Sequence, residues 1–334
     1  MSDRLPSPND DQGNDLHAAS ACVACGLDFS ESATFAVEIA ASFARALHEP
    51  LLLVHAHESA ARQRLPENLN ESLRRFLRDQ FEETADYLRS SGIPIITAFH
   101  SGEPAMSLLT ETAEHDARLL VLGAPLDGEA ARRVSLEVAR ETPVPALFVR
   151  QPAPLKAWLS GERELRVLVG IDFSSASWVA LRWVKWLREL GTCDVTVAVL
   201  EPEVLPPTGS GFHCKAEADN LVRQTTKAQE QFFRRLVETL LGRPRLRVRF
   251  EYGFARSDAH FIEMASAVRA DLIAFGVGAS SAARGNNQPI WPGVLHYGPF
   301  NVALVPYQFG DSAPCFAQSQ KKQNHDHEPT ISYK

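Results

Sequence analysis

The sequence predicts two tandem α/β/α sandwiches, each built around a five-stranded parallel sheet. Three observations predict this fold. The chain has 334 residues, whereas single domains usually hold about 100–200. A motif of Gly, an apolar residue, Asp, Phe and Ser occurs twice, at residues 26–30 and 170–174. Short apolar segments alternate with longer segments of helical periodicity, which is typical of parallel strands joined by right-handed crossovers.

The first copy, residues 20–150, begins with an apolar strand that leads into a helix at residues 33–47. A second, long helix is predicted by apolar residues that recur at helical spacing. Its expected buried face consists of Leu73, Phe76, Leu77, Phe81 and Leu88. Strands apolar on both faces indicate a sheet covered by helices. We expect them at residues 21–27, 51–56, 93–99, 119–122 and 145–149.

The second copy, residues 164–307, repeats this order of elements. Its first strand ends at Ile171, and a helix follows at residues 176–190, where Trp183 and Trp186 share the predicted core face. The long helix is expected to bury Leu221, Ala228, Phe232, Leu236 and Leu240. Further strands are predicted at residues 194–200, 246–252, 272–275 and 301–305.

Three segments lie outside the two copies. Residues 151–163 contain Pro152 and Pro154 and are expected to be a linker. The polar termini, residues 1–19 and 308–334, are predicted to be disordered. The tail holds two nearby histidines, His325 and His327, but no further ligands accompany them, so we expect no metal site there.

Composition excludes several classes of protein. The formal net charge is -7, whereas nucleic-acid binding needs clustered Lys and Arg, so we expect no nucleic-acid partner. No run of about 18 apolar residues predicts a transmembrane helix, and we expect no membrane partner. The polar start of the chain does not resemble a secretory signal, so a cytoplasmic location is expected.

The five cysteines do not form a recognisable framework. Their number is odd and they are scattered, which argues against a set of disulfides. Cys22 and Cys25 have the spacing of a redox motif, but residues three apart on a strand point to opposite faces. We therefore interpret them as small apolar core residues rather than as a metal or redox pair.

The repeated motif, the Gly102-Glu103-Pro104 turn, the apolar strand closed by Gly123, and the closing residues 142–150 together resemble the universal stress protein family. The resemblance covers both copies, although the second is more divergent. It implies a Rossmann-like fold of the adenine-nucleotide-binding type, with ATP as the ligand at the carboxyl ends of the strands. It also implies that the two copies pair within the chain, for which the edges of the fifth strands are a candidate surface; a homodimer is a further possibility.

Nucleotide-binding members carry Gly-x-x-Gly, nine residues and Gly-Ser/Thr, because glycines let the backbone approach phosphates. The first copy departs from this pattern. It has Gly123, then Leu126 where the second glycine belongs, and a glycine at Gly128 instead. Arg132 and Arg133 stand where Gly-Ser is expected, immediately before Val134 and Ser135 of the family's last helix.

The second copy departs further. Gly276 is present, but Ala279 replaces the second glycine, and Gln288-Pro289 replaces Gly-Ser. Proline has no amide hydrogen to donate to a phosphate. Trp291 follows in the same loop, and we hypothesise that its ring fills the site that the glycines would otherwise leave open.

Several candidate site residues have two interpretations. Asp28 and Asp172 either contact a nucleotide or hold the turn between strand and helix, and Ser30 and Ser174 favour helix capping. The arginine pair either grips phosphate or begins a solvated helix. His55 and His57 follow the second strand, where an adenine would lie, or else simply end that strand.

Three functions remain open from the sequence. The first is a stress-response protein that binds adenine nucleotide through Asp28, Gly123, Gly128 and the arginines. The second is a structural or interaction module without nucleotide. The third is a nucleotide hydrolase, for which no nucleophile elbow, metal-binding motif or P-loop gives support. We expect no enzymatic activity.

Overall fold

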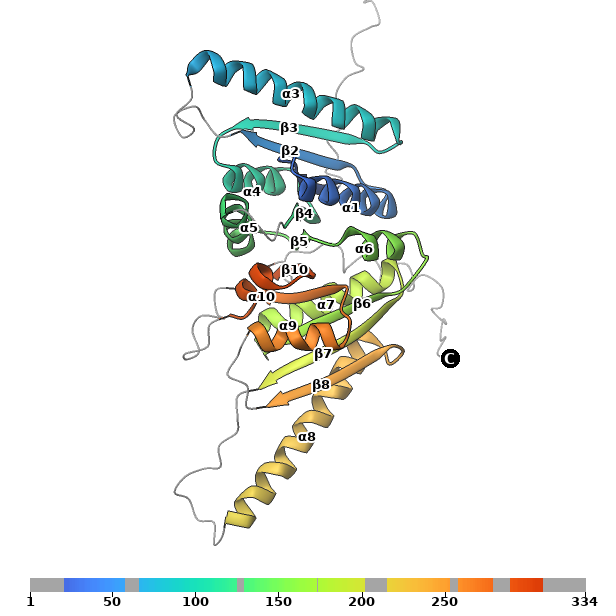
Figure 1. Cartoon of the computed structure of the whole chain (residues 1–334). Coiled ribbons are helices and arrows are strands. Elements are labelled where there is room, and N and C mark those ends of the chain that lie inside the picture. The colour runs from blue at the N-terminus through green and yellow to red at the C-terminus, as the bar shows by residue number, and fades with distance from the viewer. Residues whose placement is uncertain are drawn as a thin grey trace, which may run out of the picture.

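The computed structural model describes residues 21–57, 66–124, 129–172, 174–201, 215–252, 258–278 and 289–308. Strands and helices alternate along the described chain (Figure 1). The strands of the first half are β1 Val23–Gly26, β2 Leu51–His57, β3 Ile95–Ser101, β4 Leu119–Gly123 and β5 Ala146–Val149. Its helices are α1 Glu31–Leu47, α3 Glu67–Ser90, α4 Pro104–Glu114 and α5 Glu129–Glu141.

The second half repeats this order after a short helix, α6 Pro152–Leu159. Its strands are β6 Leu165–Ile171, β7 Cys193–Glu201, β8 Leu246–Tyr252, β9 Leu272–Val277 and β10 Asn301–Pro306. Its helices are α7 Ser175–Leu190, α8 Lys215–Leu241, α9 Asp258–Ala267 and α10 Trp291–Tyr297.

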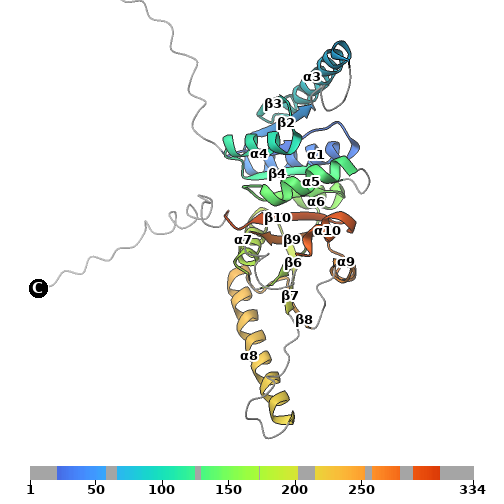
Figure 2. The same ribbon diagram turned by 90° about the vertical axis from the view of Figure 1, so that its left-hand side faces the viewer.

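The ten strands form one sheet in the order β3-β2-β1-β4-β5-β10-β9-β6-β7-β8. All pairs within a half are parallel, which confirms the predicted α/β fold. The halves meet where β5 pairs antiparallel with β10, with Leu147 opposite Ala303. Figures 1 and 2 show the resulting sheet running through the whole molecule. The inner edge of each half is therefore covered by the other.

Helices cover both faces of this sheet, and each core extends across both halves. On one face, side chains of α1, α3, α6, α7 and α8 form one cluster. On the other face, α4, α5, α9 and α10 form the second. Cys25 belongs to the first cluster and Cys22 to the second, as expected for strand residues three apart. Burial raises the pKa of the Cys22 thiol to about 12, so it stays protonated at neutral pH.

Of the two long helices, α8 buries a different face from the one that its apolar pattern predicts, whereas α3 buries most of its predicted face. In α8 the buried residues include Phe233 and Val237, whereas Phe232 is 70% exposed and Leu236 is also exposed. In α3, Phe81 and Leu88 are buried as predicted, but Phe76 is 60% exposed. The apolar surface of α8 is wider than the contact that one sheet face provides, so its pattern alone does not identify the buried side.

The expected linker, residues 151–163, contains the helix α6. Pro152 lies in the first turn, where a missing amide hydrogen costs nothing. Leu155 and Trp158 are fully buried. The Trp158 ring lies 6.0 Å from that of Phe43 in α1, and a Cβ at Gly191, just after α7, would lie 2.5 Å from its Nε1. This segment is therefore part of the core between the halves.

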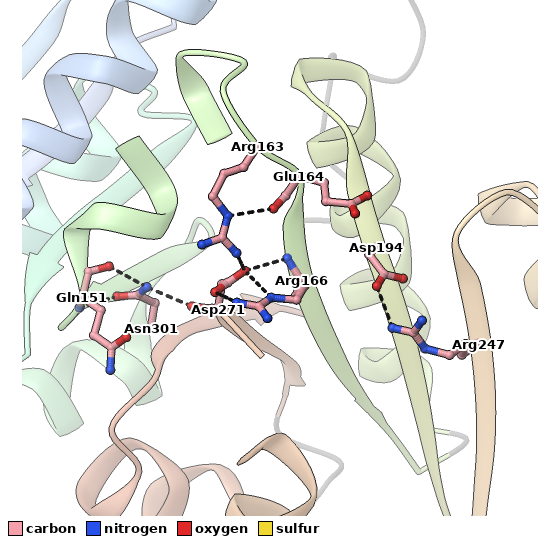
Figure 3. Close-up of polar contacts among 8 residues, drawn as sticks. All are labelled: Gln151, Arg163, Glu164, Arg166, Asp194, Arg247, Asp271 and Asn301. Carbon is pink, nitrogen blue, oxygen red and sulfur yellow. Dashed lines mark hydrogen bonds and ion pairs between the residues drawn. The ribbon is translucent and has the colours of Figure 1, made fainter. Parts of the chain in front are cut away.

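Polar side chains also join the halves (Figure 3). The buried Asn301 accepts hydrogen bonds from the amides of Arg150 and Gln151, both at 2.9 Å. Its Nδ2 donates to the carbonyls of Gln151 and Asp271, again at 2.9 Å. The amide group thus uses both lone pairs and both hydrogens. Asp271 is held in turn by the guanidinium of Arg166, through bonds of 3.0 and 3.1 Å.

Candidate functional site

A cavity of about 310 Å³ opens at the carboxyl ends of β1, β2 and β4 in the first half. This is the edge at which parallel α/β sheets bind ligands. Its floor is mainly apolar, and a few polar side chains lie around it, as in many small-molecule sites. The lining residues are Gly26, Leu27, Asp28, Ser32, Ala33, Val54, Ala56, Pro104, Leu108, Leu122, Gly123, Arg133, Val134 and Ser135.

Asp28 and Ser30 shape the turn from β1 into α1 beside this cavity. The Asp28 Oδ1 accepts hydrogen bonds from the Ser30 amide at 3.0 Å and from its hydroxyl. The Ser30 hydroxyl oxygen accepts from the Ala33 amide at 3.2 Å and thereby caps α1. Asp28 is exposed and also lines the cavity, so the turn occupies one carboxylate oxygen while the side chain still faces the site.

Gly123 lies where β4 ends against the first turn of α1. A Cβ at this position would lie only 2.5 Å from the backbone carbon and oxygen of Ser32. Gly276 in the second half approaches α7 more closely, with 1.9 Å to the carbonyl oxygen of Ala176. These glycines, predicted from the sequence as ligand contacts, therefore have a packing role in both halves.

Residues of α5 form the polar side of the cavity. Arg133 is half-exposed, and its Nε lies 3.9 Å from a carboxylate oxygen of Glu137 one turn later. Ser135 is buried, and Val134 adds apolar surface. The predicted site residue Gly128 and the side chain of Arg132 lie outside the described residues.

His55 does not line this cavity, which corrects its predicted place beside an adenine. Side chains alternate along β2, so Val54 and Ala56 face the cavity while His55 faces the other core. There its ring lies 4.9 Å from that of Phe99 and 5.0 Å from that of Phe29. The Nδ1 atom pairs with the Leu27 carbonyl at 2.7 Å, and burial lowers the pKa of His55. His57 is buried on the same face and pairs with Asn70 of α3.

The equivalent place in the second half is almost filled. A cavity of about 50 Å³ remains there, little more than the volume of a water molecule. Phe275 and Trp291 are both buried and line it, together with Pro289 and Ile290. Asp172 also lines it and bonds to the Ser174 amide at 3.1 Å and to the Ser177 hydroxyl, so this aspartate holds the turn into α7.

Some lining residues of the first cavity carry no signal in the sequence. Val54, Ala56, Leu108 and Leu122 are apolar residues in apolar segments, and they become site residues only through the order of the strands. Pro104 is the exception, because it belongs to the turn on which the family resemblance partly rests.

Comparison with known proteins identifies the first half. A protein-family model, that of the universal stress protein family, matches residues 23–150. Residues 23–150 belong to the universal stress protein family. The match spans the five strands and all the lining residues of the larger cavity in this universal stress protein domain. No curated protein sequence matches the chain.

Solved structures extend the likeness in fold to both halves. A universal stress protein from Archaeoglobus fulgidus is 14% identical with a TM-score of 0.59, and the match covers 86% of this chain and 96% of that one. A protein of unknown function from Pseudomonas aeruginosa is 14% identical with a TM-score of 0.61, covering 91% and 98%. The fold of this chain, including both halves, therefore recurs in other single chains.

Within the described residues, no helix is long and apolar enough to span a membrane. The same part of the chain holds no cluster of three or more His, Cys, Asp or Glu side chains arranged for a metal ion.

Proposed function

We propose that this protein is a stress-response protein that binds one adenine nucleotide, in the cavity of the first half. Family membership of residues 23–150 supports the stress-response role. The main support for binding of one nucleotide is the difference in volume between the two cavities, about 310 Å³ in the first half and about 50 Å³ in the second. The first approaches the usual size of small-molecule sites, and the second holds at most a water or two.

The chemistry of the first cavity fits a nucleotide. Its apolar floor suits an adenine ring. At the α5 side, Arg133 offers a cation, and a guanidinium can bind phosphate in two-point fashion. The side-chain charge would then substitute for the backbone amides of the family's glycine pattern, which this chain lacks. In the second half, Trp291 and Phe275 take the place of the ligand.

Isothermal titration calorimetry of the full chain with ATP tests this function. We expect one site per chain. Arg133→Ala is expected to weaken binding by roughly tenfold or more, since a charged hydrogen bond contributes about 1.5–3 kcal/mol. Arg140→Ala is the matched control, because this arginine is an exposed residue of the same helix outside the cavity. Two sites per chain, or equal affinities in both variants, would contradict the proposal.

The alternative is an interaction module that binds no nucleotide, which the altered phosphate loops favour. Absence of saturable binding by ATP, ADP and AMP in the same titration would support it. Native mass spectrometry of the purified chain gives an independent readout, because a copurified nucleotide would add its mass to that of the protein.

A further inference from the structure

Arg150 lies immediately after β5, and its half-buried guanidinium bridges the two halves. The Nε atom donates to the carbonyl of Ala124 in the first half at 2.9 Å. Nη1 and Nη2 donate to the carbonyls of Gly298 and Leu295 in the second half. Burial lowers the pKa of Arg150 to about 10, so the group remains a cation at neutral pH.

The carbonyls that Arg150 contacts belong to the surroundings of both cavities. Ala124 directly follows Gly123, which lines the first cavity. Leu295 and Gly298 lie at the carboxyl end of α10, where carbonyls lack helical partners and carry the negative end of the helix dipole. The first residue of that helix, Trp291, lines the second cavity. The short helix α10 therefore begins at the second cavity. Its carboxyl end accepts hydrogen bonds from Arg150, which also donates to Ala124 beside the first cavity.

Among the described residues, this bridge has no equivalent in the opposite direction. In the sheet, Val149 pairs with Gly123 in the first half and Val305 pairs with Gly276 in the second. The residues that follow, Arg150 and Pro306, are thus at equivalent positions. A proline side chain has no donor, so the position equivalent to Arg150 offers no cation to the first half.

We propose that Arg150 is a positioning residue that makes the first cavity dependent on α10 of the second half. When α10 is ordered, its carbonyls hold the Arg150 guanidinium in place. The guanidinium in turn fixes the Ala124 carbonyl and thereby the neighbouring Gly123 in the cavity wall. Coupling between two sites is reciprocal, so binding in the first cavity stabilises α10, and loosening α10 weakens that binding. The statement about ligand rests on the proposed function, whereas the coupling itself does not.

Hydrogen exchange on the full chain without ligand tests the coupling. Trp291→Ala removes the side chain that anchors the start of α10. We expect faster exchange in the peptide that ends β4, where the Ala124 amide donates to the Val149 carbonyl at 3.0 Å. Arg150→Lys should produce a similar increase, because lysine cannot reach three carbonyls at once. The double variant should exchange no faster than either single one.

Trp178→Ala is the matched control, since this tryptophan also lies in the second half but packs against Phe233 in the opposite core. It should leave the end of β4 unchanged. The proposal is overturned if Trp291→Ala leaves the exchange of this peptide unaltered, or if the effects of the two substitutions add.

A second measurement uses ATP as the probe. Arg150→Lys should weaken ATP binding by about fivefold or more, although this side chain does not line the cavity. Saturating ATP should slow exchange in α10 of the wild type but not of this variant, and Trp178→Ala shows whether lowered stability alone weakens binding. Wild-type affinity in Arg150→Lys would overturn the proposal. Failure of the wild type to bind ATP would instead refute the proposed function, and the ligand-free exchange would still decide the coupling.

Discussion

Glycine at the end of β4 is needed for contact between the sheet and the first turn of α1. The backbone of Ser32 occupies the space that a side chain at Gly123 would need. The same requirement exists at Gly276, which faces a nearly filled cavity. A glycine at this strand end therefore carries no information about whether the cavity beside it holds a ligand.

Gly123→Ala is expected to destabilise the fold by about 1–3 kcal/mol or more, because a backbone segment must move to admit the Cβ. Urea unfolding monitored by circular dichroism measures this change. Gly102→Ala is the control at the same edge of the sheet, where the nearest atom to a Cβ is a serine hydroxyl at 3.8 Å. Equal stability of the two variants would show that α1 can shift freely away from β4.

The candidate site could be predicted in part from single residues. The repeated motif correctly placed Asp28 and Ser30 at the turn beside the cavity, because a strand that leads into a helix must turn at its carboxyl end. Of the two interpretations of His55, the structure does not bear out contact with the cavity. Residues on both faces of β2 are apolar, so its sequence pattern does not tell which residues share a face with the cavity. The alternation of side chains along β2 shows that His55 faces away from the cavity only once Val54 is known to line it.

At the scale of elements, the long helices carry more apolar surface than the sheet covers. In α8, Phe232 and Phe233 are neighbours in sequence, yet their exposed fractions are 70% and 3%. Helical periodicity correctly predicts that the segment is a helix, but two apolar stripes lie about 100° apart on it. Packing against the sheet determines which of the two stripes is buried, and the sequence of the helix alone does not predict it.

This neighbouring pair gives a direct test of the orientation of α8. Phe233→Ala should cost about 3–5 kcal/mol of unfolding free energy, as for other buried phenylalanines. Phe232→Ala should change it by less than about 0.5 kcal/mol, as for most surface positions. Thermal or urea unfolding of both variants measures the difference. A larger loss in Phe232→Ala would mean that α8 buries the other stripe.

Residues 151–163, between the halves, show that prolines do not by themselves indicate a linker without regular structure. Pro152 and Pro154 favoured a linker, yet proline is well tolerated in the first turn of a helix. Leu155 and Trp158 are three residues apart, which is helical spacing, and both are buried in the core cluster that also includes residues of α1 and α7. Lys156 adds an ion pair with Glu38 of α1. Eight residues are too few for periodicity to be decisive without knowledge of what they pack against.

At the scale of the whole molecule, the internal repeat correctly predicts five parallel strands in each half, but the two sets join into one ten-stranded sheet. The way in which they join depends on contacts far apart in sequence. Asn301 illustrates this, because it appeared only as the first residue of a strand, whereas its side chain bonds to residues about 150 positions away. Sequence patterns with a period of two or 3.6 residues carry no information about such a partner.

Separation of the halves should expose an aggregation-prone edge. A fragment of residues 20–150 would leave β5 unpaired on the side that β10 covers, with Ala146, Leu147 and Phe148 no longer buried by the second half. We expect the fragment to self-associate or precipitate. Size-exclusion chromatography with light scattering compares it with the full chain at equal concentration. A monomeric fragment as stable as the full chain would show that the seam contributes little.

The β5–β10 seam joins two halves that are encoded as one polypeptide, and this has a consequence for how they can differ. In an assembly of identical subunits, every substitution appears twice, so a cavity cannot be closed on one side only. Here Trp291 lines a small cavity in one half while the other half keeps a larger one, and a proline stands at the position equivalent to Arg150. Because the two halves are parts of one chain, their sequences can diverge independently. One half can keep a cavity for a ligand while the other half supports it structurally.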